Sequence, residues 1–241
     1  GCISYRGYFK ERAARKYAGR LAARGDDIYV GGITAYSTLG RFRDPVLNTM
    51  LNQSEPDFVG LLFHELAHQR LYVQDDSAFN EAFATAVEME GLRRWQFQHG
   101  KLTAVDDDDQ RAAAIFLLRS TRKRLREIYA SDRDVSAKRM AKQQVLEDAS
   151  RSYELLAADW QLAGKKTQPY ARLFRQGLNN ASLAAVATYD DYVPAFNELL
   201  QQCGAWLACF YYRSEAIAAL PPAERKARVQ ELLQTADSQE K

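Results

Sequence analysis

The stretch FHELAHQRLYVQDDSAFNEAFATAVE, residues 63–88, holds two of the three histidines of this 241-residue chain. It predicts two helices joined by a short polar turn, because apolar residues recur at helical spacing on both sides of QDDS. His64 and His68 stand four residues apart, so a helix carries both imidazoles on one face. Glu65 follows one step round that helix. The pattern His-Glu-x-x-His is typical of zinc-dependent hydrolases.

Each residue type in this motif suits one task of metal-assisted peptide hydrolysis. Two imidazoles on one helix face can bind a single zinc ion, and zinc lowers the pKa of a coordinated water to about 7. A carboxylate beside such a water, here Glu65, can accept its proton and later pass it to the leaving amine. The motif therefore predicts a catalytic zinc with His64 and His68 among its ligands.

A catalytic zinc takes three protein ligands and keeps a fourth position for water, so one more ligand is needed. Glu81 is the best candidate, because it stands between Phe79 and Phe83, where an unpaired carboxylate would be costly. Two antiparallel helices would bring it back against the histidines. Asp75 and Asp76 are rival ligands, although their position before the second helix favours N-capping.

The surroundings of the motif add three expectations. Glu88 shares a helix face with Glu81 and is predicted to hydrogen-bond a ligand histidine. His99, at the far end of the second helix, is predicted to be a surface residue. The first helix is predicted to be largely buried because of its apolar residues, which are Leu61, Leu62, Phe63, Leu66 and Ala67.

The composition is that of an ordinary globular protein, with 46% hydrophobic and 27% charged residues and a net charge of +2. This charge gives no reason to expect a nucleic-acid partner, and the basic residues of 119–128 are expected to form a solvated helix surface. No apolar run approaches the length of about 18 to 20 residues that a membrane-spanning helix needs. The charge therefore does not indicate a polyanionic partner, and the apolar runs do not predict a membrane-spanning helix.

The three cysteines do not settle the compartment. In one continuous helix Cys203 and Cys209 would lie about 9 Å apart along the axis, too far for a disulfide. Gly204 could break that helix, so their pairing stays open. Cys2 has no apolar segment before it and is expected to be an internal cysteine, not a lipid anchor.

The remaining chain predicts a mostly helical protein with one early sheet. Residues 26–40 are rich in β-branched and aromatic residues around a glycine pair, and predict one or two strands. The aspartates 106–109 are expected to form a loop. We predict a single α+β domain over residues 1–241, predominantly α-helical, with a small N-terminal β-sheet packed on the His64 helix. Its sheet-containing part is about 1–56 and its helical part about 57–241. Helices are expected at about 8–24, 45–52, 57–72, 78–98, 110–130 and 134–163, from near 170, and after 221.

The segment HELAHQRLYVQDDSAFNEAFATAVEMEG, residues 64–91, resembles the signature of a bacterial family of putative zinc aminopeptidases. The resemblance extends to residues 1–9, 29–51 and 179–196, and so spans most of the chain. The motif followed by Asn-Glu is also similar to the wider gluzincin group of metallopeptidases, in which the glutamate of the second helix is the third zinc ligand. The resemblance thus implies a gluzincin-like fold, one zinc per chain, and Glu81 as a ligand.

The resemblance also implies roles for residues outside the motif. Tyr189 in ATYDDY resembles a recurrent tyrosine of the family, whose phenol could stabilise the oxyanion of the tetrahedral intermediate. Tyr36 and Tyr192 are competitors for this role. In gluzincin-like folds an edge strand before the zinc helix pairs with the substrate backbone, and residues 31–38 are the candidate, although an ordinary core strand fits equally.

An aminopeptidase also needs an acidic group for the free amine of its substrate. Asp75, Asp76, Asp190 and Asp191 are all candidates, and the sequence does not choose among them. Family members commonly carry a lipoprotein signal ahead of the segment that matches residues 1–9. The resemblance therefore implies the periplasmic side of the bacterial cell envelope, with membrane association only through an N-terminal lipid anchor.

The predicted function is a zinc-dependent peptide hydrolase, and the resemblance specifies an aminopeptidase acting on peptide substrates. A zinc metalloendopeptidase is the nearest alternative. A non-catalytic, zinc-stabilised peptide-binding protein of the envelope is a second, although an intact Glu65 argues against it because a structural site needs no base. A helical adaptor without metal is a third.

Overall fold

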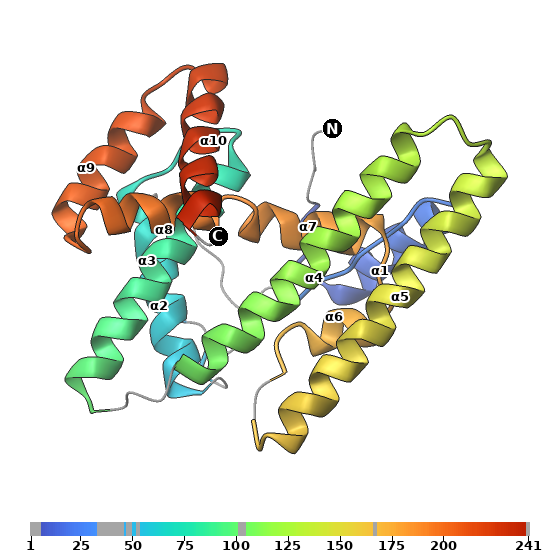
Figure 1. The fold of residues 1–241 in the computed structure, drawn as a ribbon, viewed down its shortest axis with the longest axis horizontal. Coiled ribbons are helices and arrows are strands. Elements are labelled where there is room, and N and C mark those ends of the chain that lie inside the picture. Colours follow the sequence, from blue (N-terminus) through green and yellow to red (C-terminus); the bar gives the residue numbers. More distant parts are fainter. Residues whose placement is uncertain are drawn as a thin grey trace. The chain divides into compact units, whose positions relative to one another are not determined.

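The computed structural model describes residues 6–32, 46, 50–51, 54–100, 105–165 and 168–239. Within these ranges the regular structure consists of helices α1 to α10 (Figure 1). The chain packs into two compact units. Unit 1 comprises Gly1–Gly31 and Thr103–Val186, and unit 2 comprises Gly32–Leu102 and Ala187–Lys241. The prediction of one domain stays a prediction.

The expected α+β class is wrong, because the described residues contain helices and no strand. Residues 26–32 have no regular structure, and residues 33–40, which carry most of the expected strand pattern, lie outside the described residues. The carbonyl oxygen of Ile28 accepts a hydrogen bond from Asn179 Nδ2 at 2.9 Å, so a side chain takes the place of a neighbouring strand here. A β-branched composition favours extended backbone, but a sheet also needs a partner strand.

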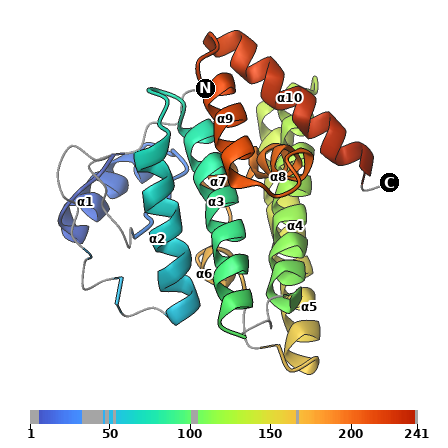
Figure 2. The same ribbon diagram turned by 90° about the vertical axis from the view of Figure 1, so that its left-hand side faces the viewer.

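Unit 2 is built around the helices of the quoted stretch (Figure 2). Its aromatic core contains Phe79, Phe83, Phe196 and Phe210, none more than 1% exposed. The rings of Phe83 and Phe210 stack with centroids 5.7 Å apart. This core joins α3 to the C-terminal helices. The helices of the unit are α2 (Glu55–Arg70), α3 (Ser77–Gln98), α8 (Val193–Gln202), α9 (Leu207–Ala218) and α10 (Pro222–Gln239).

Capping residues explain where α2 and α3 begin. The hydroxyl of Ser54 accepts from the Asp57 backbone N–H ahead of α2, and the carboxylate of Asp76 accepts from the Phe79 N–H ahead of α3. The two helices lie side by side as an antiparallel hairpin (Figures 1 and 2). The expectation that α2 is largely buried is only partly confirmed, since Leu66 is 56% exposed.

Unit 1 centres on a long antiparallel hairpin of α4 and α5. Leu118 and Leu125 of α4 pack with Val145 and Tyr153 of α5 in one core. The loop expected at residues 106–109 is wrong, because these aspartates form the start of α4, where the helix dipole stabilises carboxylates. The helices are α1 (Glu11–Ala22), α4 (Val105–Ala130), α5 (Val135–Leu162), α6 (Ala171–Arg175) and α7 (Asn180–Asp190), which runs on into unit 2.

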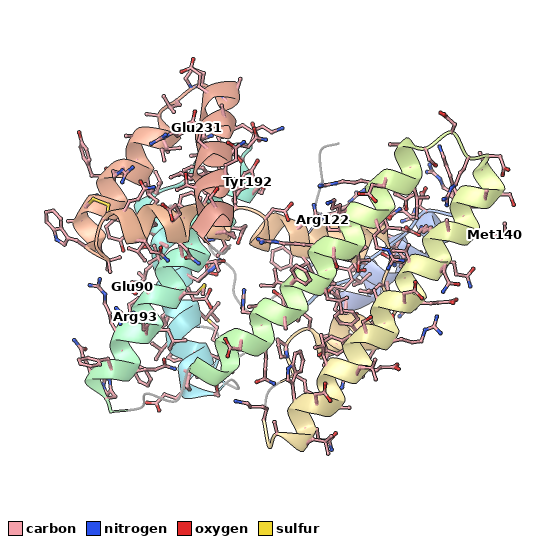
Figure 3. The ribbon with its side chains drawn as sticks, in the orientation of Figure 1. Glu90, Arg93, Arg122, Met140, Tyr192 and Glu231 are labelled. Carbon is pink, nitrogen blue, oxygen red and sulfur yellow. A yellow bond between two sulfur atoms is a disulfide. The ribbon has the colours of Figure 1, made fainter. Side chains whose placement is uncertain are left out.

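A disulfide joins Cys203 and Cys209, whose Cα atoms are 5.7 Å apart (Figure 3). The helical path breaks between α8 and α9, where Gly204 and Ala205 both adopt positive φ angles. The break suggested by Gly204 is therefore confirmed, and it permits the pairing that the sequence left open. Among the described helices, none combines the length and apolar character needed to cross a membrane.

Gly91 of α3 packs against the Phe63 ring of α2. A Cβ atom at this position would lie 2.6 Å from Cγ of the Phe63 ring. We expect Gly91→Ala to lower the free energy of unfolding by about 1–2 kcal/mol, because overpacking outweighs the gain in helix propensity. Urea denaturation measures this. Gly19→Ala in α1, where a Cβ meets nothing within 4 Å, is the matched control and should be neutral or stabilising. Equal effects of the two substitutions would contradict the close packing.

Candidate metal centre

The hairpin of α2 and α3 brings together the three side chains that the sequence predicts as metal ligands. His64 Nε2 lies 3.2 Å from Glu81 Oε2, and His68 Nε2 lies 3.2 Å from His64 Nε2. The remaining separation, from His68 Nε2 to Glu81 Oε2, is 3.7 Å. All three side chains are at least three-quarters buried. Two imidazoles and one carboxylate thus converge on one point.

These separations fit a tetrahedral divalent ion. Zinc–donor bonds of about 2.0–2.1 Å place tetrahedral ligands about 3.3–3.4 Å apart, close to the three distances found here. The two imidazole Nε2 atoms face each other, so their lone pairs repel unless a proton or a cation lies between them. A metal ion that accepts both lone pairs and the Glu81 carboxylate would satisfy all three donors.

Glu88 fixes the orientation of the His64 ring. Its Oε2 atom lies 3.0 Å from His64 Nδ1, which confirms the predicted hydrogen bond to one of the candidate ligand histidines. Because Nδ1–H donates to this carboxylate, Nε2 is left to face Glu81 and His68. Gly60 of α2 makes room for the contact, since a Cβ there would lie 3.3 Å from Glu88 Oε1.

Without a metal, the cluster is held together by a proton on His64. Burial disfavours the imidazolium, but the hydrogen bonds and charges of Glu81 and Glu88 outweigh it and raise the pKa of His64 from 6.5 to about 9. Burial likewise disfavours the Glu81 carboxylate, but the hydrogen bonds to His64 and His68 lower its pKa from 4.5 to about 2. A metal ion bound by these side chains would therefore have to displace this proton.

Glu65, the predicted general base, lies on α2, and His99, the third histidine, lies at the end of α3. Glu65 is half-buried on α2, next to His64 in the chain, and its catalytic role stays a prediction. His99 is the exposed C-cap of α3, and its Nδ1 contacts the Trp95 carbonyl at 2.7 Å, so its assignment as a surface residue is confirmed.

Of the aspartates before α3, Asp76 is already engaged. Its Oδ1 accepts from the Phe79 N–H and its Oδ2 from Arg225 Nε, so capping is confirmed for it. Asp75 is exposed and has a φ of 62°. Neither is among the groups that converge with the two histidines.

The tyrosine and remaining aspartate predictions are left untested. The side chains of Tyr189 and Asp190 and the whole of Tyr36 lie outside the described part of the structure. Tyr192 is half-buried in unit 2 (Figure 3), where burial and the charges of Asp76 and Asp191 raise its pKa.

Sequence reasoning missed two residues that hold this region. Asn80 bonds the backbone of Val73 through both atoms of its amide, and Arg225 forms the ion pair with Asp76 across 149 positions of sequence. A signal for Arg225 was present, because it shares one helix face with the buried residues Val229 and Leu232. An arginine in an apolar stripe needs a buried partner.

Comparison with known protein families identifies a match over most of the chain. A family model described as "Putative aminopeptidase" matches residues 1–229 of the chain. Neither a curated protein nor a solved structure matches the chain.

The stability of the metal-free protein should depend on pH through His64 and Glu81. A raised histidine pKa contributes stability that is complete below about pH 6.5 and is lost as the pH rises through about 9. A lowered glutamate pKa contributes stability that is complete above about pH 4.5 and is lost as the pH falls through about 2. We expect the combined contribution to be largest between about pH 4.5 and 6.5.

Thermal unfolding of chelator-treated protein measures this dependence. Glu81→Gln should reduce the fall in Tm between about pH 6.5 and 9, although Glu88 still raises the pKa of His64, whereas His99→Ala should leave the fall unchanged. An equally steep fall in Tm in Glu81→Gln would show that the interaction of His64 with Glu81 does not cause it.

Proposed function

The chain belongs to the putative aminopeptidase family, and from this premise we propose that it is a zinc-dependent aminopeptidase. The observation that supports the metal-dependent part is the convergence of His64, His68 and Glu81 on one point between α2 and α3. The aminopeptidase part rests on family membership. A peptide with a free N-terminus is the proposed substrate.

In this proposal His64, His68 and Glu81 hold the metal, and Glu88 orients the His64 ring. Bound zinc supplies a Lewis acid that polarises the peptide carbonyl and lowers the pKa of water. Glu65 accepts the proton of the attacking water and delivers it to the amine nitrogen as the carbon–nitrogen bond breaks.

Tyr189 is the proposed donor to the oxyanion of the tetrahedral intermediate. Its phenol would hydrogen-bond the carbonyl oxygen as negative charge develops on it. The Tyr189→Phe variant removes the hydroxyl and keeps the ring, so it separates this role from packing.

The periplasmic side of the bacterial envelope is the proposed location. The disulfide between Cys203 and Cys209 supports it, because disulfides persist in oxidising compartments and are rare in the cytosol.

Metal content and peptide hydrolysis together test the proposal. We expect one zinc per wild-type chain and much less in Glu81→Ala. Glu65→Gln should keep its zinc but lose activity by at least about 10²-fold, because general-base catalysis contributes that much. His99→Ala removes the third histidine, which lies at the end of α3 and outside the cluster, and should match the wild type in both measurements.

The outcomes separate the proposal from its alternatives. A zinc-loaded protein that cleaves nothing in a broad peptide library would indicate a non-catalytic binding protein. An absence of bound metal at neutral pH would indicate a helical adaptor.

Acetylation of the substrate distinguishes an aminopeptidase from an endopeptidase. We expect a short peptide with a free N-terminus to be cleaved at its first bond, and the same peptide to resist cleavage once acetylated, because the free amine is part of what an aminopeptidase recognises. Mass spectrometry of the products identifies the cleaved bond. Internal cleavage of both peptides would establish the endopeptidase instead.

A further inference from the structure

The turn from α2 into α3 is fixed by two side chains at the beginning of α3. Asp76 Oδ1 accepts from the Phe79 N–H at 3.2 Å. Asn80 accepts from the Val73 N–H at 2.8 Å and donates to the Val73 carbonyl at 2.7 Å. Asn80 is 2% exposed, so no water competes for these bonds. The residue that follows Asn80 is Glu81, the proposed third ligand.

A residue from the other end of the chain completes this arrangement. Arg225 of α10 donates from Nε to Asp76 Oδ2 at 2.7 Å. Its Nη1 donates to the carbonyl oxygens of Ala218 and Leu220, at 3.2 and 2.9 Å. The guanidinium carbon lies 6.0 Å from the ring centroid of Phe79. One guanidinium therefore ties the turn between α9 and α10 to the beginning of α3.

The burial of this ion pair makes its geometry specific. The side chain of Arg225 is 7% exposed and that of Asp76 is 26% exposed. A buried charge is costly unless its partners are well placed, and the planar guanidinium offers its donors in a fixed fork. Asp76 uses one oxygen for the helix cap and the other for Arg225, so any shift of the guanidinium also shifts the cap.

We propose that Arg225 is a positioning residue for the metal centre, because it holds Asp76 and so the N-terminal end of α3, where Glu81 lies just after the first turn. The inference rests on the proposed metal site. Glu81 lies five residues after Asp76, with its carboxylate 3.2 Å from His64 Nε2. Metal–donor distances tolerate only about 0.2 Å of variation, so a small tilt of the N-terminal end of α3 would misplace the Glu81 carboxylate.

Arg225→Gln is the first test, and Zn²⁺ affinity is the first measurement. Competition with a chromophoric chelator, well below the melting temperature of each variant, gives the dissociation constant. We expect Zn²⁺ binding to weaken by about 10- to 100-fold, as for other groups that orient metal ligands. The visible d–d absorption of the Co²⁺-loaded protein should change, and kcat should fall with little change in KM.

Arg228→Gln is the matched control. Arg228 lies on the same helix and pairs with Glu231, but both side chains are solvent-exposed, at 43% and 60%. Its removal should leave Zn²⁺ affinity and the Co²⁺ spectrum as in the wild type. Arg225→Lys keeps the charge but lacks the planar fork of donors, so its Zn²⁺ affinity should lie between those of the wild type and Arg225→Gln.

Asp76→Asn tests the path through the cap. Asparagine can still accept from the Phe79 N–H but no longer carries the charge that Arg225 meets. We expect Asp76→Asn to weaken Zn²⁺ binding. The double variant with Arg225→Gln should bind Zn²⁺ no more weakly than the single variants, because both substitutions remove the same interaction. If Arg225→Gln does not fold, Arg225→Lys and Asp76→Asn carry the test.

A fall in Tm with unchanged Zn²⁺ affinity and an unchanged Co²⁺ spectrum would overturn the positioning role. Glu81→Ala separates this failure from that of the proposed function. If Glu81→Ala loses zinc and the Arg225 and Asp76 variants do not, only the positioning role is wrong. If Glu81→Ala binds zinc as the wild type does, the metal site itself is wrong, and the positioning role with it.

Discussion

The close packing of α3 against α2 is the constraint on which the candidate metal centre depends. Two histidines on one helix cannot complete a catalytic metal site, so the carboxylate must come from the neighbouring helix at a fixed depth. Gly91 lets that helix approach the Phe63 ring, and Gly60 leaves space beside the Glu88 carboxylate. The aromatic core around Phe83 holds α3 from its other side. The distances of 3.2 and 3.7 Å between donor atoms follow from this packing.

The same packing creates an electrostatic demand. Two imidazoles and two carboxylates share a largely buried region, and their lone pairs point at one another. Such a cluster is stable only around positive charge, supplied by a proton or by a metal ion. Protonation and folding are therefore linked in one group of side chains, and a bound metal ion would be linked to both.

How much of this the sequence could predict depends on how local the information is. The convergence of His64, His68 and Glu81 and the contact of Glu88 with His64 were predictable because their spacings lie within two adjacent helices and one short turn. The sheet was wrongly expected, because β-branched residues in 26–40 indicate extended backbone without indicating a partner strand. Leu66 shows that an apolar residue on the ligand helix need not be buried. Arg225 was missed because its partner lies 149 residues away, although its position between apolar residues of α10 was a usable signal.

The disulfide between α8 and α9 has a practical consequence for anyone who purifies this protein. Expression in a reducing cytosol would leave Cys203 and Cys209 as a pair of neighbouring thiols. Thiolates are soft ligands with high affinity for zinc, so they could scavenge the ion from the medium. Zinc counted in such a preparation would then include ions that have nothing to do with the helical hairpin. Protein recovered from an oxidising compartment avoids this contamination, and a thiol titration shows whether the two cysteines are oxidised or reduced.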